Sequence, residues 1–138
     1  MKIAIINGPN LNLIGTRETD IYGGETFEHY FQKLRKKYEN VDFDYFQSNI
    51  EGEIINEIQR AGLKMDGIIL NPGGYTHTSV AIGDAVAGIK VPVVEVHISN
   101  IDAREEFRKL SHVSAKCKGT ISGLGLKGYV LAVEYFLK

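Results

Sequence analysis

Polar stretches rich in histidine, arginine, tyrosine and asparagine follow three separate apolar runs. Residues 7–17 and Tyr22 follow the first run, residues 71–77 follow another, and residues 97–100 follow a third, with Arg108 not far behind. A histidine can give or take a proton near neutral pH, and a guanidinium favours the ionised form of a nearby phenol. Amides and backbone N–H groups can hold an oxyanion or a carboxylate. This combination favours proton-transfer chemistry on a small anion.

Taken singly, each of these residues also has an ordinary structural explanation. Asparagine, proline and glycine supply turns, and a tyrosine or arginine in a loop is usually a surface residue. His97 suits a hydrogen-bonded core histidine, while His77 and Asp84 suit the capping and the solvated face of a helix. The gathering of so many such groups on one predicted rim is what favours a functional site.

Three other chemistries have weaker support. His77, Asp84 and His97 could serve as metal ligands, but neither His-Glu-x-x-His nor paired cysteines occur in the sequence. It also lacks the Gly-x-Ser-x-Gly motif of acyl transfer and a Gly-x-Gly-x-x-Gly dinucleotide loop after the first run. The single cysteine, Cys117, is predicted to be an inert buried thiol near the start of a strand. We therefore expect neither a metal nor a cofactor.

The elements that must position these residues alternate between strand and helix. Continuous apolar runs predict buried strands over residues 2–7, 67–71 and 92–97, and an alternating run predicts a half-exposed edge strand over 41–47. Residues 119–122 are expected to form a last short strand. Helical spacing of apolar residues predicts helices in the segments between these strands. The expected helices cover 25–39, 53–61, 78–87 and 126–137, with one or two helical turns over 103–110 and a capping box from Ser48 to Glu51.

This alternation predicts an α/β fold. We expect one domain over residues 1–138, built as a three-layer doubly wound five-stranded parallel sheet, flavodoxin-like, with strand order 2-1-3-4-5. Strands one, three and four are then neighbours, so the polar stretches that follow them converge on one crevice at the carboxyl edge of the sheet. The connection over residues 8–24 exceeds the roughly two to six residues usual for such loops, which suggests a functional role.

Composition limits the kinds of partner that the protein is expected to bind. The 138 residues carry a formal net charge of −1, which argues against nucleic acid as the main partner. The first apolar run is too short for a signal peptide or a membrane span, and no other run is longer, so a cytoplasmic location without membrane contact is expected. A small anionic ligand needs only a local site, so it remains compatible with the net charge of −1.

At the polar loops the sequence resembles one known family, the type II 3-dehydroquinate dehydratases. The resemblance covers nearly the whole chain, in order and with compatible spacing. It rests on Asn7-Gly-Pro-Asn-Leu-Asn-Leu-Ile-Gly-Thr-Arg-Glu18 with Ile21-Tyr-Gly23, on Asn71-Pro-Gly-Gly-Tyr-Thr-His77, on Glu95-Val-His-Ile-Ser-Asn100, and on Arg104-Glu-Glu-Phe-Arg108 with Gly119-Thr-Ile-Ser-Gly-Leu-Gly125.

The resemblance implies a hydro-lyase that converts 3-dehydroquinate to 3-dehydroshikimate. It implies anti elimination of water through an enolate, in the shikimate (or quinate) pathway, without metal or cofactor. It also implies a homododecamer built from four trimers. The alternative from another class is a non-catalytic flavodoxin-like module that binds a ligand.

The resemblance also implies roles for four catalytic residues. Tyr22 would be the general base that takes the C2 proton, and Arg17 would stabilise the tyrosinate; both would lie on a loop that closes over the substrate. His97 would be the general acid that protonates the leaving C1 hydroxyl. Asn10 would hold the water that steadies the enolate oxygen.

Six further residues are implied to bind the substrate. The carboxylate would be held by the Asn71 side chain and by the backbone N–H groups of Ile98 and Ser99. His77 and Arg108 would bind ring hydroxyls. The remaining residue, Asp84, would reach into the site of a neighbouring subunit.

Overall fold

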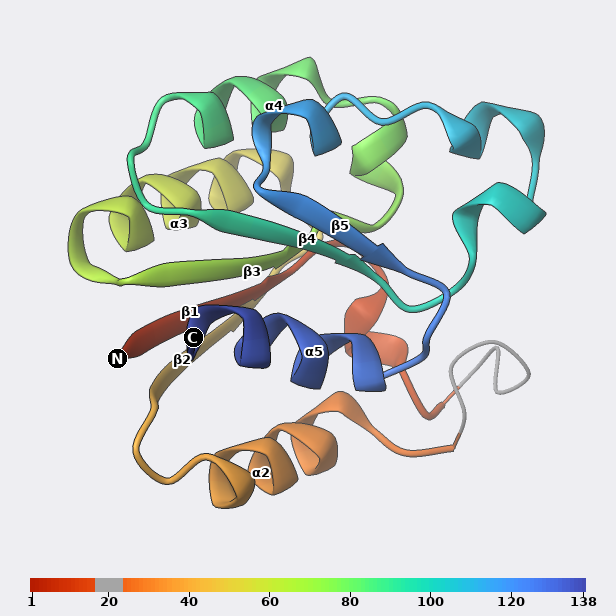
Figure 1. Ribbon diagram of the computed structural model, residues 1–138. Helices are drawn as coiled ribbons and strands as arrows, with labels where there is room; N and C mark the ends of the chain where they lie inside the picture. Colours follow the sequence, from red (N-terminus) through yellow and green to blue (C-terminus); the bar gives the residue numbers. More distant parts are fainter. Residues whose placement is uncertain (17–23) are drawn as a thin grey trace.

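The fold is a five-stranded parallel sheet covered by helices on both faces (Figure 1). The computed structural model describes residues 1–16 and 24–138, and its strand order is β2-β1-β3-β4-β5, which confirms the predicted doubly wound topology. Every neighbouring pair of strands is parallel. The strands are β1 (Lys2–Asn7), β2 (Asp42–Gln47), β3 (Gly67–Asn71), β4 (Val93–His97) and β5 (Gly119–Ser122).

Four α-helices in the described part of the chain cover this sheet, two on each face (Figure 1). Two of them begin at a side-chain cap, because Thr26 and Ser79 each accept a hydrogen bond from a backbone N–H three residues on. The helices are α2 (Phe27–Lys37), α3 (Glu51–Lys64), α4 (Val80–Ala87) and α5 (Lys127–Phe136).

Alternation along each strand divides the core into two clusters. On β1, Ile3 and Ile5 point toward α2 and α5, whereas Ala4 and Ile6 point toward α3 and α4. These isoleucines are completely buried, and each contributes about 1.5–3 kcal/mol through removal of its side chain from water. The central strands are therefore fixed from both faces, and their carboxyl ends are fixed with them.

The edge strand β2 behaves as its alternating pattern predicts. In β2 the acidic residues Asp42 and Asp44 are exposed while Phe43 and Tyr45 pack against the core, so this strand lies half open to water at one edge. The segment between β4 and β5 forms short 3-10 turns, η3 (Ile101–Ala103), η4 (Glu106–Lys109) and η5 (Ser114–Lys116), in place of one regular helix.

Two local predictions need correction. Ser48 and Glu51 do not form a capping box, because Ser48 Oγ donates to Glu53 while Glu51 instead accepts from Ser79. Cys117 ends the η5 turn two residues before β5, and it is half-buried rather than fully buried. Burial raises the pKa of its thiol to about 12, helped by the negative charge of Glu95, so the thiol is a poor nucleophile. None of the helices described is long and apolar enough to cross a membrane.

Candidate active site

A pocket of about 180 Å³ opens at the carboxyl edge of the sheet, above the ends of β1, β3 and β4. This volume is smaller than the roughly 300–1,000 Å³ of drug-sized sites, so it suits a compact ligand. Most of the residues predicted to form a site meet here although they are distant in sequence. Lining the pocket are Asn10, Asn71, His77, His97, Ile98, Ser99 and Arg108.

Backbone from two loops, residues 8–9 and 71–73, meets closely beside the pocket, and Pro9, Asn71 and Gly73 line it. Gly8 N donates to the Asn71 carbonyl at 2.7 Å, and a Cβ on Gly8 would lie only 2.5 Å from the Pro72 oxygen. Gly73 has a φ of +61°, and a Cβ there would lie 3.0 Å from the Pro9 oxygen. The two loops approach this closely because both positions lack a side chain.

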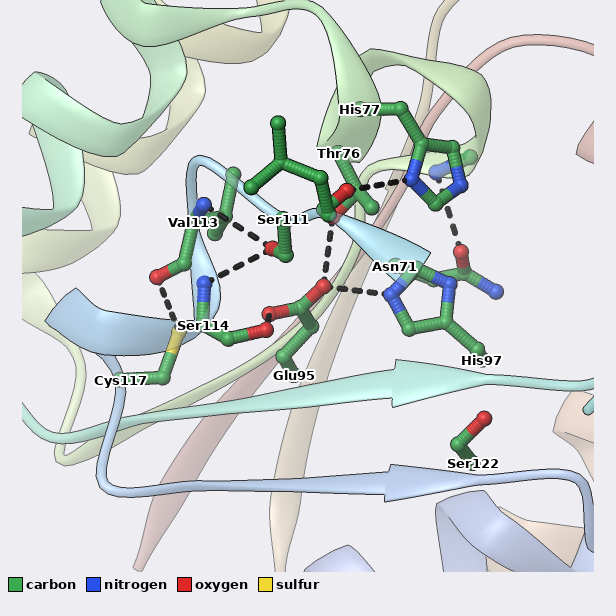
Figure 2. Close-up of polar contacts among 12 residues, drawn as sticks. Asn71, Thr76, His77, Glu95, His97, Ser111, Val113, Ser114, Cys117 and Ser122 are labelled. Atoms are coloured by element: carbon green, nitrogen blue, oxygen red, sulfur yellow. Dashed lines mark hydrogen bonds and ion pairs between the residues drawn. The ribbon is translucent and has the colours of Figure 1, made fainter. Parts of the chain in front are cut away.

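His97 enters the pocket from the end of β4 with its ring held by Glu95 (Figure 2). Its Nε2 contacts Glu95 Oε2, and both side chains are almost completely inaccessible to water. An ionised carboxylate can only accept hydrogen bonds, so Nε2 must carry the hydrogen. Nδ1 is therefore the ring nitrogen available to a ligand.

Glu95 is itself held by two hydroxyl groups. Thr76 Oγ1 donates to Oε2 at 2.5 Å, and Ser114 Oγ donates to Oε1 at 2.7 Å (Figure 2). Burial alone would raise the pKa of Glu95, but the hydrogen bonds from His97, Thr76 and Ser114 and the charge of His97 outweigh it and lower that pKa below 4.5. Glu95 is thus a carboxylate anion at neutral pH, buried in the sheet.

His77 lies beside His97, with the two rings stacked at 6.4 Å between centroids. Its Nδ1 donates to the Leu110 carbonyl at 2.8 Å (Figure 2). Burial lowers the pKa of His77, and the positive charges of His97 and Arg108 lower it further, against the opposing effect of the Leu110 hydrogen bond. A neutral His77 that donates through Nδ1 presents Nε2 as an acceptor, which suits a ligand hydroxyl.

Asn71 and Asn10 bring amides to the site from the ends of β3 and β1. Asn71 Oδ1 accepts from Gly73 N at 3.1 Å, and its Nδ2 donates to Tyr129 Oη at 3.0 Å. Asn10 has a φ of +69°, which an asparagine tolerates, and its backbone N–H donates to Asn49 Oδ1 at 3.0 Å. The Asn71 amide is thus held on both sides, while Asn10 is fixed through its backbone.

Arginines supply positive charge at the pocket wall. Arg108 Nε donates to Glu105 Oε1 at 2.8 Å, and its guanidinium lies 4.9 Å from the centre of the Phe107 ring. Arg104 also lines the pocket, and its Nη1 lies 3.4 Å from Ser99 Oγ. The wall can therefore attract an anion although the protein as a whole is almost neutral.

One of the predicted residues that the structure describes does not line this pocket. Asp84 lies on the exposed side of α4, outside the pocket of its own subunit. Arg17 and Tyr22 lie outside the described residues. Over residues 1–16 and 24–138, no three histidine, cysteine, aspartate or glutamate side chains cluster closely enough to hold a metal ion.

Glu95, Thr76 and Ser114 were not among the predicted site residues. A signal for Glu95 was present, because it is the one acid inside an otherwise apolar predicted strand. A buried carboxylate needs a partner, and residues two apart on a strand point to the same side. His97 stands at that spacing. Ser114 carried no such signal, since only the three-dimensional fold brings it to β4.

The strand order and the position of the pocket define a flavodoxin-like domain with a small-molecule site at its carboxyl edge. The sequence matches the family described as Dehydroquinase class II over residues 1–137. The chain therefore belongs to the class II dehydroquinases.

Relatives and solved structures agree with this assignment. A 3-dehydroquinate dehydratase of Fusobacterium nucleatum is 54% identical, with 100% of this chain and 97% of the relative covered. One of Caldicellulosiruptor bescii is 51% identical, with 99% and 96% covered. The crystal structure of a type II dehydroquinase from Butyrivibrio crossotus superposes with a TM-score of 0.96 at 47% identity, over 100% of this chain and 98% of that one.

Proposed function

We propose that this protein removes water from 3-dehydroquinate to give 3-dehydroshikimate, as a 3-dehydroquinate dehydratase of the shikimate pathway. The observation that carries this is His97, held by a buried carboxylate and facing a compact pocket with anion-binding groups. Membership of the dehydroquinase family and the names of its relatives support the same reaction. The alternative of a non-catalytic ligand-binding module is not favoured.

In the proposed mechanism, elimination proceeds in two proton transfers through an enolate. Tyr22, as tyrosinate stabilised by Arg17, takes the proton from C2, and negative charge develops on the C3 oxygen. A water held by Asn10 steadies that oxygen. His97, as an imidazolium that keeps its Nε2 hydrogen on Glu95, then gives its Nδ1 proton to the C1 hydroxyl, which leaves as water while the C1–C2 double bond forms.

The proposed binding groups are five residues that line the pocket. Asn71 and the backbone N–H groups of Ile98 and Ser99 grip the carboxylate. His77, which presents Nε2 as an acceptor, and Arg108, which presents donors, take the ring hydroxyls. This arrangement is supported by the position of all five residues around one pocket.

Assembly is also part of the proposal. Asp84 stands on the outer face of α4 beside the exposed residues Val80 and Ala81, a small and mostly apolar surface suited to contact with another copy of the chain. Asp84 of one subunit would complete the site of the next, within a trimer and a dodecamer of four trimers. A cytoplasmic location remains a prediction.

A direct assay tests the function. Purified protein mixed with 3-dehydroquinate in the presence of a chelator should produce the ultraviolet absorbance of a conjugated enone acid, and a His97→Ala variant should not. A folded wild-type protein that gives no absorbance, or activity that chelator abolishes, would contradict the proposal.

A further inference from the structure

Tyr129 of α5 places its hydroxyl between two buried amides at the ends of β1 and β3. Its Oη donates to Asn7 Oδ1 at 2.8 Å and accepts from Asn71 Nδ2 at 3.0 Å. Asn7 and Asn71 are register partners in neighbouring strands, so both side chains point to the sheet face that α5 covers. Tyr129 and Asn7 are completely buried, and Asn71 is almost so.

The hydrogen bonds around Asn71 determine which side of its amide carries the oxygen and which the nitrogen. Oδ1 is taken by the Gly73 N–H, and one Nδ2 hydrogen is taken by Tyr129. The second Nδ2 hydrogen is left for a ligand in the pocket that Asn71 lines. A flipped amide would turn its carbonyl oxygen toward an anionic ligand and would leave the Gly73 and Tyr129 groups mispaired.

We propose that Tyr129 is a positioning residue, which holds the donor side of the Asn71 amide toward the carboxylate of the substrate. This role rests on the proposed function, in which Asn71 grips that carboxylate. Tyr129 does not itself line the pocket, and it acts only through the amide.

The packing of the Tyr129 ring and the hydrogen bonds of its hydroxyl group can be separated. Phe27 and Tyr30 pack against the ring, with centroids at 5.0 and 6.3 Å, so an apolar ring of the same shape would fill the core equally well. The contribution specific to the hydroxyl is therefore its pair of hydrogen bonds to the two amides, without which its burial would be costly. Burial also raises the pKa of Tyr129 far above its ordinary value, so the donor hydrogen is always present.

The test is the substitution Tyr129→Phe, matched by Tyr30→Phe. Tyr30 belongs to the same aromatic cluster, but its hydroxyl donates to the Leu126 carbonyl at 2.7 Å and to neither amide. Loss of one hydrogen bond that orders a ligand contact should raise the KM of Tyr129→Phe for 3-dehydroquinate about 3- to 10-fold. Its kcat should stay within about twofold, because no proton-transfer group is touched. Tyr30→Phe should also lower Tm, but with an unchanged KM.

A second comparison shows whether the effect passes through the amide. In an Asn71→Ala background, Tyr129→Phe should change KM no further, because the group it positions is absent. An unchanged KM in Tyr129→Phe, an equal rise in Tyr30→Phe, or an additive rise in the double variant would each overturn the positioning role. Failure of the proposed function would look different, since the wild type itself would then give no product.

Discussion

Glu95 and His97, two residues apart on β4, point to the same side of the strand and hold each other through a carboxylate–imidazole hydrogen bond. Both ends of this pair are anchored in the central sheet and not in a loop. The orientation of the proposed general acid therefore depends on the stability of the sheet, and the segment that carries Ser114 supports it from outside.

We expect Glu95→Gln to lower kcat about 10- to 100-fold, by analogy with the loss of carboxylates that orient metal-ligating histidines. The amide keeps the shape but no longer offers a carboxylate to Nε2. Steady-state kinetics with 3-dehydroquinate measure this, and Glu39→Gln on the exposed surface is the control. Equal kcat values for the two variants would show that Glu95 does not act on His97.

The same carboxylate predicts a pH dependence of stability. The folded state holds the pKa of Glu95 below its unfolded value of 4.5, so the folded state binds fewer protons than the unfolded state. The contribution of Glu95 to the free energy of unfolding is complete above pH 4.5 and is lost as the pH falls through the lower pKa of the folded state. Denaturant titrations between pH 6 and pH 3 (about the range over which carboxylates titrate) should show a smaller loss of unfolding free energy in Glu95→Gln than in the wild type.

Tyr22→Phe should lower turnover by about 10² to 10⁴, the usual value of a general base, while the substrate still binds. Arg17→Ala should lower kcat more than it weakens binding, because its charge matters most when the tyrosinate forms. Tyr135→Phe, on the exposed side of α5, is the matched control. Calorimetry separates binding from turnover, and normal turnover in Tyr22→Phe would remove this residue from the mechanism.

Asp84→Ala should weaken both the assembly and the substrate site, because the residue stands outside its own pocket on an exposed helix face. Sedimentation velocity and KM measure the two effects on one preparation. Asp42→Ala changes an equally exposed acid on β2 and should alter neither. If Asp84→Ala matched that control in both measurements, the interface role would be excluded.

Gly83→Ala should destabilise the protein by about 1–3 kcal/mol, a usual cost of overpacking. A Cβ there would lie 2.3 Å from the His112 oxygen, so the segment that brings Ser114 to Glu95 would have to move, and kcat should fall with stability. Gly52→Ala faces open space in α3 and should be neutral or stabilising by up to about 1 kcal/mol. Thermal unfolding and kinetics of the two variants check both expectations.

Much of the fold was readable from the sequence, because burial on both faces leaves a continuous apolar run in each central strand. The boundaries predicted for β1, β3 and β5 agree with the structure, and the predictions for β2 and β4 each differ by one residue. Helix starts were less accurate. The caps at Thr26 and Ser79 place the first helical residues of α2 and α4 two positions later than apolar spacing alone suggested.

The site was readable only in part. Residues at strand ends, such as Asn71 and His97, could be placed because a parallel sheet gathers its carboxyl ends. Ser48 and Glu51 were mispaired, since local spacing does not reveal that Glu51 lies near Ser79. Nothing in the sequence marks the Tyr129 hydroxyl, because only the pairing of β1 with β3 brings the two amides that it joins side by side.

The close backbone contact between residues 8–9 and 71–73 limits how substrate preference can change. Because Gly8 and Gly73 bring main chain against main chain, no side-chain replacement can deepen the site there. Room for a larger or differently substituted ring must come from side chains elsewhere in the lining, such as Leu11, Ile101 and Arg104. Laboratory evolution toward new cyclic acids should therefore accumulate its substitutions among those side chains and leave both glycines untouched.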